Sequence, residues 1–313
     1  MQKEKSMDCQ PENQFLFKQN GVEVWIKRLD TLTKDSRGNK LFKLHFNLNR
    51  AKELGQNTLL TFGGAYSSHI SAVAATGKEK GFRTIGVIRG DELGKDLDKT
   101  LSHNPTLAEA YANGMKFYFV SREAYRNKAS KDFLAKLHGK FGDFYLLPEG
   151  GTNELAVKGC EYILDAADKE FDIITCPVGT GGTISGIINA SGASQKILGF
   201  SALKANLEKE VEKFTIKTNW KLFPETKFGG FAKINSELVG FMNKFAEDYR
   251  IVLNPIYTGK MMFSLIDMIK QGYFKENSRI LAVHTGGLQG IQGINAGLNK
   301  KQLPILKCKI DEA

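Results

Sequence analysis

The chain has 313 residues, of which 42% are hydrophobic and 10% aromatic, with only 7 prolines. This composition predicts a globular protein with a sizeable core and excludes a disordered or fibrous one. The net charge of +10 favours anionic ligands, but 44 Lys and Arg are scattered among 34 Asp and Glu without a dense basic block, so we expect no nucleic-acid partner. No apolar run reaches 18 residues, so we expect no membrane partner.

The first predicted strand covers residues 21–30, where apolar and polar residues alternate, and it leads to a turn at residues 37–39. Gly38 and Asn39 tolerate the backbone angles of a tight turn, which holds Lys40 at a fixed place. Apolar residues recur at helical spacing from Leu41 to Ala51 and predict a packed helix that anchors this lysine. A buried lysine loses its charge readily and acts as a nucleophile toward a carbonyl group. The alternative is a solvated surface lysine.

Short apolar segments and helical segments then alternate along the chain, which predicts open parallel sheets with helices on both faces, an α/β fold. No repeat or flexible linker separates them. The predicted strands are 58–62, 84–89, 116–120, 144–147, 171–176, 197–201 and 279–283. The predicted helices are 68–80, 105–113, 122–137, 154–167, one from residue 184, 236–246 and 261–270.

A glycine-rich loop follows the predicted strand 171–176 and opens the next helix. Its glycines let backbone amides approach an anion, its threonines supply hydroxyls, and the helix points its positive end at the same place. The spacing matches neither the dinucleotide fingerprint nor a nucleotide-triphosphate loop, so we expect a simpler phosphate cradle, with a turn without ligand as the alternative. The loop residues are Gly179, Thr180, Gly181, Gly182 and Thr183.

Two other loops, 63–69 and 284–290, occupy the carboxyl ends of predicted strands, where parallel sheets bind ligands. In 63–69, the hydroxyls and the free amides of a helix N-terminus suit a substrate carboxylate; alternatively a serine caps the helix and the histidine belongs to the core. Segment 254–260 is a turn before a helix, where we expect Tyr257 and Thr258 to face the same crevice, and segment 284–290 is a further glycine turn. One lysine, one phosphate cradle and several hydroxyl-bearing loops together predict a phosphorylated aldehyde cofactor bound as a Schiff base.

Five segments, in this order, resemble the 1-aminocyclopropane-1-carboxylate deaminase and D-cysteine desulfhydrase family: 38–41, 63–69, 179–183, 255–260 and 284–287. The resemblance extends roughly from Gly21 to Asn295. It implies pyridoxal 5'-phosphate as the cofactor and a fold similar to the tryptophan synthase β-subunit (fold type II), with two open parallel-sheet α/β domains and the site between them. The larger, cofactor-binding domain would comprise residues 1–46 and 148–313, and the smaller, inserted domain residues 47–147.

The same resemblance implies roles for individual residues. Catalytic roles fall on Lys40, the Schiff-base lysine, and on Ser67 and Tyr257. The substrate would lie at Ser67, Ser68 and His69. The residues expected to bind the cofactor are Lys40, Ser68, Gly179, Thr180, Gly181, Gly182, Thr183, Thr258 and Thr285.

Departures from the deaminase pattern decide between the chemistries of the family. Thr258 stands where deaminases carry a glutamate facing the pyridine nitrogen, and Thr285 where they tend to carry leucine; both match the desulfhydrases. Ser68 replaces an asparagine, and Phe231 replaces a second active-site tyrosine. The pattern favours a lyase that converts D-cysteine to pyruvate, sulfide and ammonia. The alternatives are aminocyclopropane carboxylate deamination to 2-oxobutyrate and ammonia, and a non-catalytic protein that only binds the cofactor.

Cysteine usage and the N-terminal segment bear on location. Cys9, Cys160, Cys176 and Cys308 are widely spaced, so we expect reduced thiols and neither a metal site nor a disulfide framework. Residues 1–13 are polar and do not resemble a signal peptide. We therefore expect a cytoplasmic protein with a small amino-acid substrate, and the family resemblance implies a homodimer.

Overall fold

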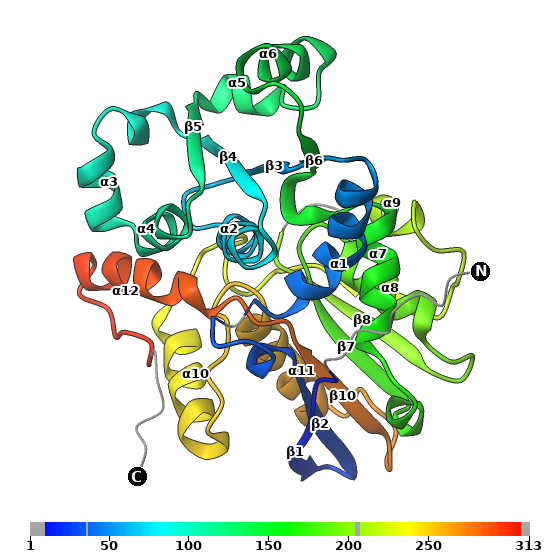
Figure 1. Ribbon diagram of the computed structural model, residues 1–313. Helices are drawn as coiled ribbons and strands as arrows, with labels where there is room; N and C mark the ends of the chain where they lie inside the picture. Colours follow the sequence, from blue (N-terminus) through cyan, green and yellow to red (C-terminus); the bar gives the residue numbers. More distant parts are fainter. Residues whose placement is uncertain (1–9, 36, 204–206, 308–313) are drawn as a thin grey trace.

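The computed structural model describes residues 10–35, 37–203 and 207–307, which form two open sheets covered by helices (Figure 1). The larger sheet has the strand order β1-β2-β10-β7-β8-β9 and the smaller sheet β5-β4-β3-β6. Every neighbouring pair is parallel except β1 and β2. The predicted α/β fold with open parallel sheets is therefore confirmed.

The strands of the larger sheet are β1 (Asn13–Gln19), β2 (Val22–Arg28), β7 (Ile173–Val178), β8 (Lys196–Ser201), β9 (Trp220–Phe223) and β10 (Arg279–His284). Those of the smaller sheet are β3 (Thr58–Gly63), β4 (Arg83–Arg89), β5 (Lys116–Val120) and β6 (Tyr145–Leu147). The helices are α1 (Asn39–Glu53), α2 (Ser68–Lys80), α3 (Leu97–His103), α4 (Pro105–Ala112), α5 (Arg122–Arg126), α6 (Lys131–Phe141), α7 (Glu154–Cys160), α8 (Gly182–Ala190), α9 (Glu208–Glu212), α10 (Ser236–Tyr249), α11 (Thr258–Lys270) and α12 (Ile291–Lys300). Short 3-10 helices are η1 (Leu29–Thr31), η2 (Asp91–Gly94), η3 (Glu149–Gly151), η4 (Glu161–Ile163), η5 (Ala167–Glu170) and η6 (Leu288–Gly290).

The central strands are mostly apolar and buried along almost their whole length because helices cover both of their faces. On β10, Ile280 and Ala282 belong to the core on the α10 and α11 side, whereas Leu281 and Val283 belong to the core on the α7 and α8 side. Strand β3 is likewise buried at all of its residues. With both faces covered, the carboxyl ends of the parallel strands are left as the general place for a ligand.

Helix α1 connects the two cores. Phe42 packs in the core of the larger sheet, and Leu44, Leu48 and Ala51 pack in the core of the smaller sheet. All four strands of the smaller sheet lie between residues 58 and 147. The proposed division at residue 46 cuts through α1 and stays a prediction.

Two predicted helices are wrong in extent. The single helix expected over 122–137 is divided into α5 and α6, because Ser130 accepts a hydrogen bond from the Phe133 amide and caps a new helix. The helix expected over 154–167 ends at Cys160 and continues only as η4. Beyond it, Asp165 accepts a bond from the Ala167 amide, and Asp168 accepts one from the Asp165 amide. These local bonds compete with the helical ones.

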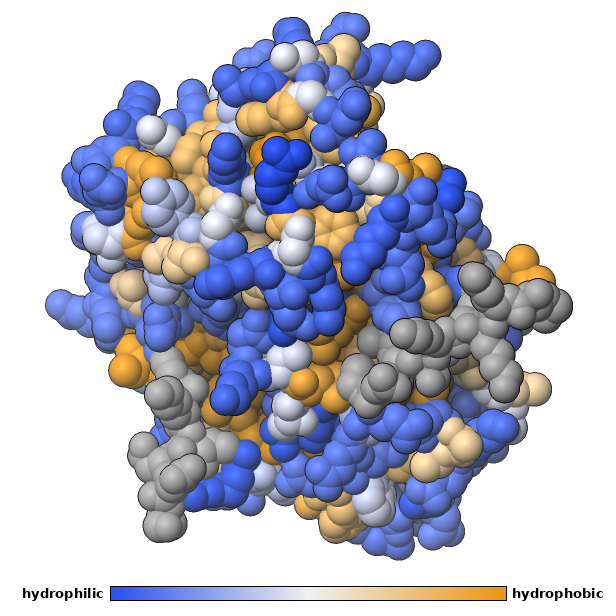
Figure 2. Space-filling model, viewed as in Figure 1, coloured by the Kyte–Doolittle hydropathy of each residue, from blue (hydrophilic) through white to orange (hydrophobic). Residues whose placement is uncertain are grey.

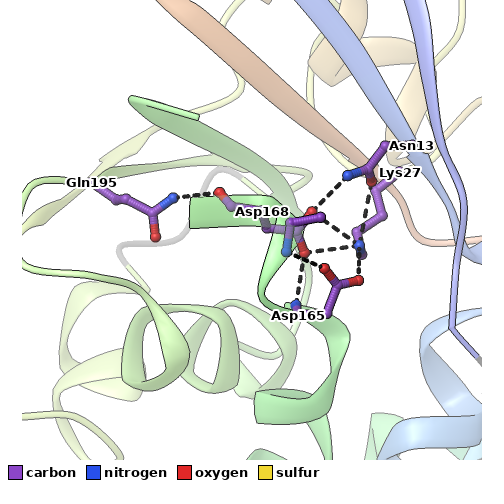
Figure 3. A network of polar contacts seen from close by, with 6 residues as sticks. Asn13, Lys27, Asp165, Asp168 and Gln195 are labelled. Atoms are coloured by element: carbon purple, nitrogen blue, oxygen red, sulfur yellow. Dashed lines mark hydrogen bonds and ion pairs between the residues drawn. The ribbon is translucent and has the colours of Figure 1, made fainter. Parts of the chain in front are cut away.

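A buried polar network ties β1 and β2 to the segment before β7 (Figure 3). Lys27 Nζ donates to Asp165 Oδ2 and Asp168 Oδ1, both at 3.0 Å, and to Asn13 Oδ1 at 3.3 Å. Asn13 Nδ2 donates to Asp168 Oδ1 at 2.7 Å, and Gln195 Nε2 donates to the Asp168 carbonyl at 2.8 Å. Lys27 and Asp168 are fully buried, so each charge depends on the other for compensation.

Hydrophilic residues cover most of the face in Figure 2, interrupted by small apolar areas. Across the described segments, no helix combines the length and the apolar character that a membrane crossing requires.

Candidate active site

Lys40 lies in the first turn of α1, at the place where the sequence predicts it. Gly38 precedes the helix with φ 56° and ψ −128°, and a Cβ atom added to it would lie 2.1 Å from the Thr285 carbonyl oxygen. The same oxygen accepts a hydrogen bond from the Asn39 amide at 3.1 Å. The start of α1 is thus fixed against the residue that follows β10, Thr285.

The surroundings of Lys40 favour a neutral amine. Burial lowers the pKa of Lys40 to about 7, and the nearby Lys43 ammonium group contributes to the shift. Lys40 Nζ donates a hydrogen bond to Asn39 Oδ1 at 3.1 Å, while Asn39 Nδ2 donates to Thr183 Oγ1 at 2.8 Å. Asn39 therefore orients the lysine relative to the glycine loop. A substantial neutral fraction at pH 7 makes Lys40 a competent nucleophile.

The glycine loop connects β7 to α8 in a conformation that excludes side chains. Gly181 has φ 85° directly before α8, and a Cβ atom on Gly182 would lie 2.8 Å from the Thr152 side chain. A Cβ atom on Gly179 would lie 3.2 Å from the Tyr257 ring. The first amides of α8 have no acceptor within the helix. This geometry suits a phosphate group.

Lys43 adds a cation to this loop that sequence reasoning missed. Its Nζ donates to the Gly150 carbonyl at 2.9 Å and to Thr152 Oγ1 at 3.0 Å, and it lies 3.5 Å from Thr180 Oγ1. Thr152 and Thr180 share a hydrogen bond of 2.6 Å. The sequence did contain a signal: Lys43 follows Lys40 by three residues in the predicted helix, and residues three apart on a helix share a face. Lys43 and Thr152 therefore lie beside the predicted loop, in contact with Thr180.

The loop between β3 and α2 brings Ser67, Ser68 and His69 to the same edge. Ser67 Oγ accepts a hydrogen bond from the Ile70 amide at 3.4 Å, so its hydroxyl caps α2. Ser68 faces the turn after β10, because its Cβ is 3.4 Å from the position of a Cβ on Gly287. The side chains of these two serines therefore point in different directions.

His69 is buried, with 2% of its surface exposed, and contacts Thr61 rather than solvent. Thr61 Oγ1 donates to the Leu147 carbonyl at 3.0 Å and lies 2.9 Å from His69 Nε2, so the histidine donates through Nε2 and Nδ1 has no partner. Burial holds the pKa of His69 well below its usual value, and Lys40 and Lys43 lower it further. The imidazole is neutral, in electrostatic reach of both lysines.

Tyr257 and Thr258 begin α11. Asn254 Oδ1 accepts the Ile256 and Tyr257 amides at 2.9 and 3.0 Å and shapes this turn. Burial, with a contribution from the Glu149 carboxylate, raises the pKa of Tyr257 to about 12, so its phenol is neutral. Thr258 is 0% exposed, and its hydroxyl has no hydrogen-bond partner.

An unpaired buried hydroxyl is costly, and Thr106 and Thr175 carry further ones. Thr258 differs from them because it follows Tyr257, whose ring lies against Gly179 of the glycine loop, so its hydroxyl is available to a polar atom of a group bound there. A lysine with a lowered pKa can hold the aldehyde of pyridoxal phosphate, the glycine loop has the geometry for its phosphate, and the Thr258 hydroxyl can serve a further polar atom. The described residues therefore fit this cofactor.

The cysteines in the described residues are reduced and buried. Cys160 and Cys176 are free buried thiols; burial raises the pKa of Cys160 to about 11 and that of Cys176 further. Cys9 and Cys308 lie outside the described residues. Within the described ranges, no group of three His, Cys, Asp or Glu side chains is arranged to hold a metal ion.

Comparison with known proteins gives named relatives that match most of the chain. It is 31% identical over 304 residues to the bifunctional D-cysteine desulfhydrase/1-aminocyclopropane-1-carboxylate deaminase, mitochondrial, of Arabidopsis thaliana, covering 87% of this chain and 74% of the relative. It is 28% identical to a D-cysteine desulfhydrase of Klebsiella pneumoniae (strain 342), covering 85% and 87%. A crystal structure described as an ACC deaminase homologue has 24% identity and a TM-score of 0.75, covering 91% and 92%, and supports the fold.

The family model for pyridoxal-phosphate dependent enzymes matches residues 12–286. This range contains the lysine turn, the glycine loop and the Thr258 turn, so the match and the geometry concern the same residues. The cofactor is pyridoxal 5'-phosphate, as the sequence predicted. The chain belongs to the family of pyridoxal-phosphate-dependent enzymes.

Proposed function

We propose that this enzyme is a lyase that eliminates sulfide from D-cysteine and releases pyruvate and ammonia. The observation that carries the proposal is the fully buried, unpaired hydroxyl of Thr258. The bound cofactor supplies an electron-withdrawing ring conjugated to the substrate nitrogen. A neutral hydroxyl at the ring nitrogen supports weaker electron withdrawal than a carboxylate would. Weaker withdrawal suffices when the leaving group is a thiolate, whereas opening a carbon ring demands more.

Lys40 would hold the cofactor covalently and then move the proton at the substrate Cα as a general base. Its pKa of about 7 supports this role, because a base is most effective when its pKa lies near the working pH. Tyr257, a neutral phenol, is proposed as a hydrogen-bond donor beside the reacting atoms. Thr285 is proposed to contribute through its carbonyl, which fixes the start of α1.

The substrate carboxylate would bind at the N-terminus of α2. Because the Ser67 hydroxyl caps that helix and the Ser67 amide donates to the Gly64 carbonyl at 3.1 Å, we assign the backbone amides of Ser68 and His69 to the carboxylate, with the Ser68 hydroxyl free to contact the cofactor. The phosphate would bind the amides of the loop 179–183, with Lys43 as the nearby cation. These elements come from both sheets, which supports a site between the two proposed domains, 1–46 with 148–313 and 47–147.

Ring opening of aminocyclopropane carboxylate is the second candidate, because the Arabidopsis relative carries both names. Phe231, which lies beside Tyr257 without a hydroxyl, speaks against it. The test is keto-acid release by the purified, cofactor-loaded enzyme from D-cysteine, L-cysteine and aminocyclopropane carboxylate. We expect pyruvate and sulfide, fastest from D-cysteine. Faster 2-oxobutyrate release would overturn the proposal, and no release from any substrate would favour a non-catalytic cofactor-binding protein.

We also propose a cytoplasmic homodimer. The buried free thiols of Cys160 and Cys176 support a reducing compartment. The dimer rests on the family resemblance. Light scattering of the purified protein tests the dimer, and cell fractionation tests the location.

A further inference from the structure

The segment 224–232 follows β9 and carries Phe231 to the ring of Tyr257. The two ring centroids are 6.2 Å apart in an edge-to-face arrangement, and Phe231 is 48% exposed. Phe228 anchors the segment by packing against Phe263. Between the segment and α11 lies a cavity of about 370 Å³. Apolar packing therefore supports the segment at Phe228, whereas the cavity leaves another part of the segment without packing against α11.

A buried pair of charges holds the backbone on either side of Gly230. The Glu225 carboxylate accepts hydrogen bonds from the Phe228 amide at 2.5 Å and from the Gly230 amide. Lys260 Nζ donates to the Gly230 carbonyl at 2.7 Å and lies 3.7 Å from Glu225 Oε2. Lys260 belongs to α11, two residues after Thr258. The pair thus connects the segment to the helix that carries Tyr257 and Thr258.

The backbone beside Phe231 has an unusual conformation. Gly229 and Gly230 have φ angles of 84° and 105°, and Ala232 has φ 57°, which a residue with a Cβ atom adopts at a cost. Such conformations persist where the surroundings enforce them, and they occur preferentially at functional sites. The bonds to both polar groups of Gly230 provide that enforcement.

We propose that Glu225 and Lys260 are positioning residues that hold Phe231 against Tyr257 and thereby fix one wall of the substrate site. We call the bonds from Glu225 and Lys260 to residues 228–230 the clamp. The inference rests on the proposed function for the substrate and on these contacts for the clamp. Neither residue is among those that we place at the reacting atoms. Loosening the wall should weaken binding of the amino acid more than it slows the chemistry at Lys40.

The test compares Lys260→Met with Lys227→Met in the cofactor-loaded enzyme. Lys227 lines the same cavity but pairs with Asp267 instead of Gly230, so it is a matched control. We expect faster amide hydrogen exchange at residues 228–230 only in Lys260→Met. We also expect about tenfold weaker binding of D-alanine, which has no leaving group, followed by the cofactor absorbance, and a raised KM for D-cysteine with kcat within about threefold.

Lys260→Met leaves the Glu225 charge buried, so the double variant with Glu225→Gln is the second test if the single variant does not fold. It should show the same faster exchange and the same weaker D-alanine binding. Unchanged exchange in the folded variants would refute the clamp, and faster exchange with unchanged D-alanine affinity would refute its role in the substrate site. If wild type releases no keto acid from D-cysteine, the proposed function fails, but exchange and D-alanine affinity still decide the clamp.

Discussion

Replacing Gly38 by alanine should inactivate the enzyme while leaving most of the fold intact. The added Cβ atom would lie 2.1 Å from the Thr285 carbonyl oxygen, where ordinary contacts begin at 3.4 Å. The start of α1 would therefore move by roughly 1 Å, and a displacement of that size at a reacting group costs about 100-fold in rate. We expect kcat/KM for D-cysteine to fall by about this factor, with a loss of about 1–3 kcal/mol in stability from the strained backbone.

The control is Gly55→Ala. Gly55 follows α1, has φ 67° and has nothing within 4 Å of an added Cβ atom, so this substitution strains the backbone without a collision. Pyruvate release and thermal unfolding should be measured on both variants. Gly55→Ala should lose stability but keep near wild-type activity. Equal activities in the two variants at equal folded fractions would refute the argument that the contact between Gly38 and Thr285 positions Lys40.

Thr258→Val should lower kcat/KM about tenfold, the effect of losing one hydrogen bond, without destabilising the cofactor-free protein. Thr175→Val removes another buried unpaired hydroxyl and should leave activity unchanged. Because the pKa of Lys40 is lowered to about 7, its neutral fraction grows as pH rises through 7. The rate at which cofactor-free protein takes up pyridoxal phosphate should therefore rise around that pH and then level off. A rate that still rises above pH 9 would contradict this. Lys43→Met removes a neighbouring positive charge and should move that midpoint upward. Lys27→Met leaves Asp168 buried without its counter-charge and should lower the free energy of unfolding by about 3–5 kcal/mol in denaturant titrations, and adding Asp168→Asn should restore part of it.

The parts of the fold that the sequence predicted are those with strong local signals. Buried strands such as β3 and β7 are short, mostly apolar runs, and the apolar residues after Lys40 recur at helical spacing. Strand β1 was not predicted, although Asn20-Gly21 joins it to β2 with φ angles of 50° and 74°. An Asn-Gly pair between strands is a strong hairpin signal, so this strand was available from the sequence.

The site was predictable where one short segment carries the chemistry. The lysine turn and the glycine loop are each a single short segment of the sequence, and the residue types within each segment indicate its function. Lys43 and Thr152 are 109 residues apart, and the packing of α1 against α7, which begins just after Thr152, brings them together. The same holds for Glu225 and Lys260, whose partnership depends on how the segment after β9 folds over α11.

The sharing of α1 between two cores limits how the enzyme can move. A helix of 15 residues is about 22 Å long, so a tilt of about 5° around its far end shifts the lysine end by roughly 2 Å. That shift exceeds what catalysis tolerates. A swing of the smaller sheet that carried α1 along would thus disconnect the lysine from its cofactor. A movement of the smaller sheet that keeps the site intact must therefore leave the lysine end of α1 in place against the Thr285 carbonyl.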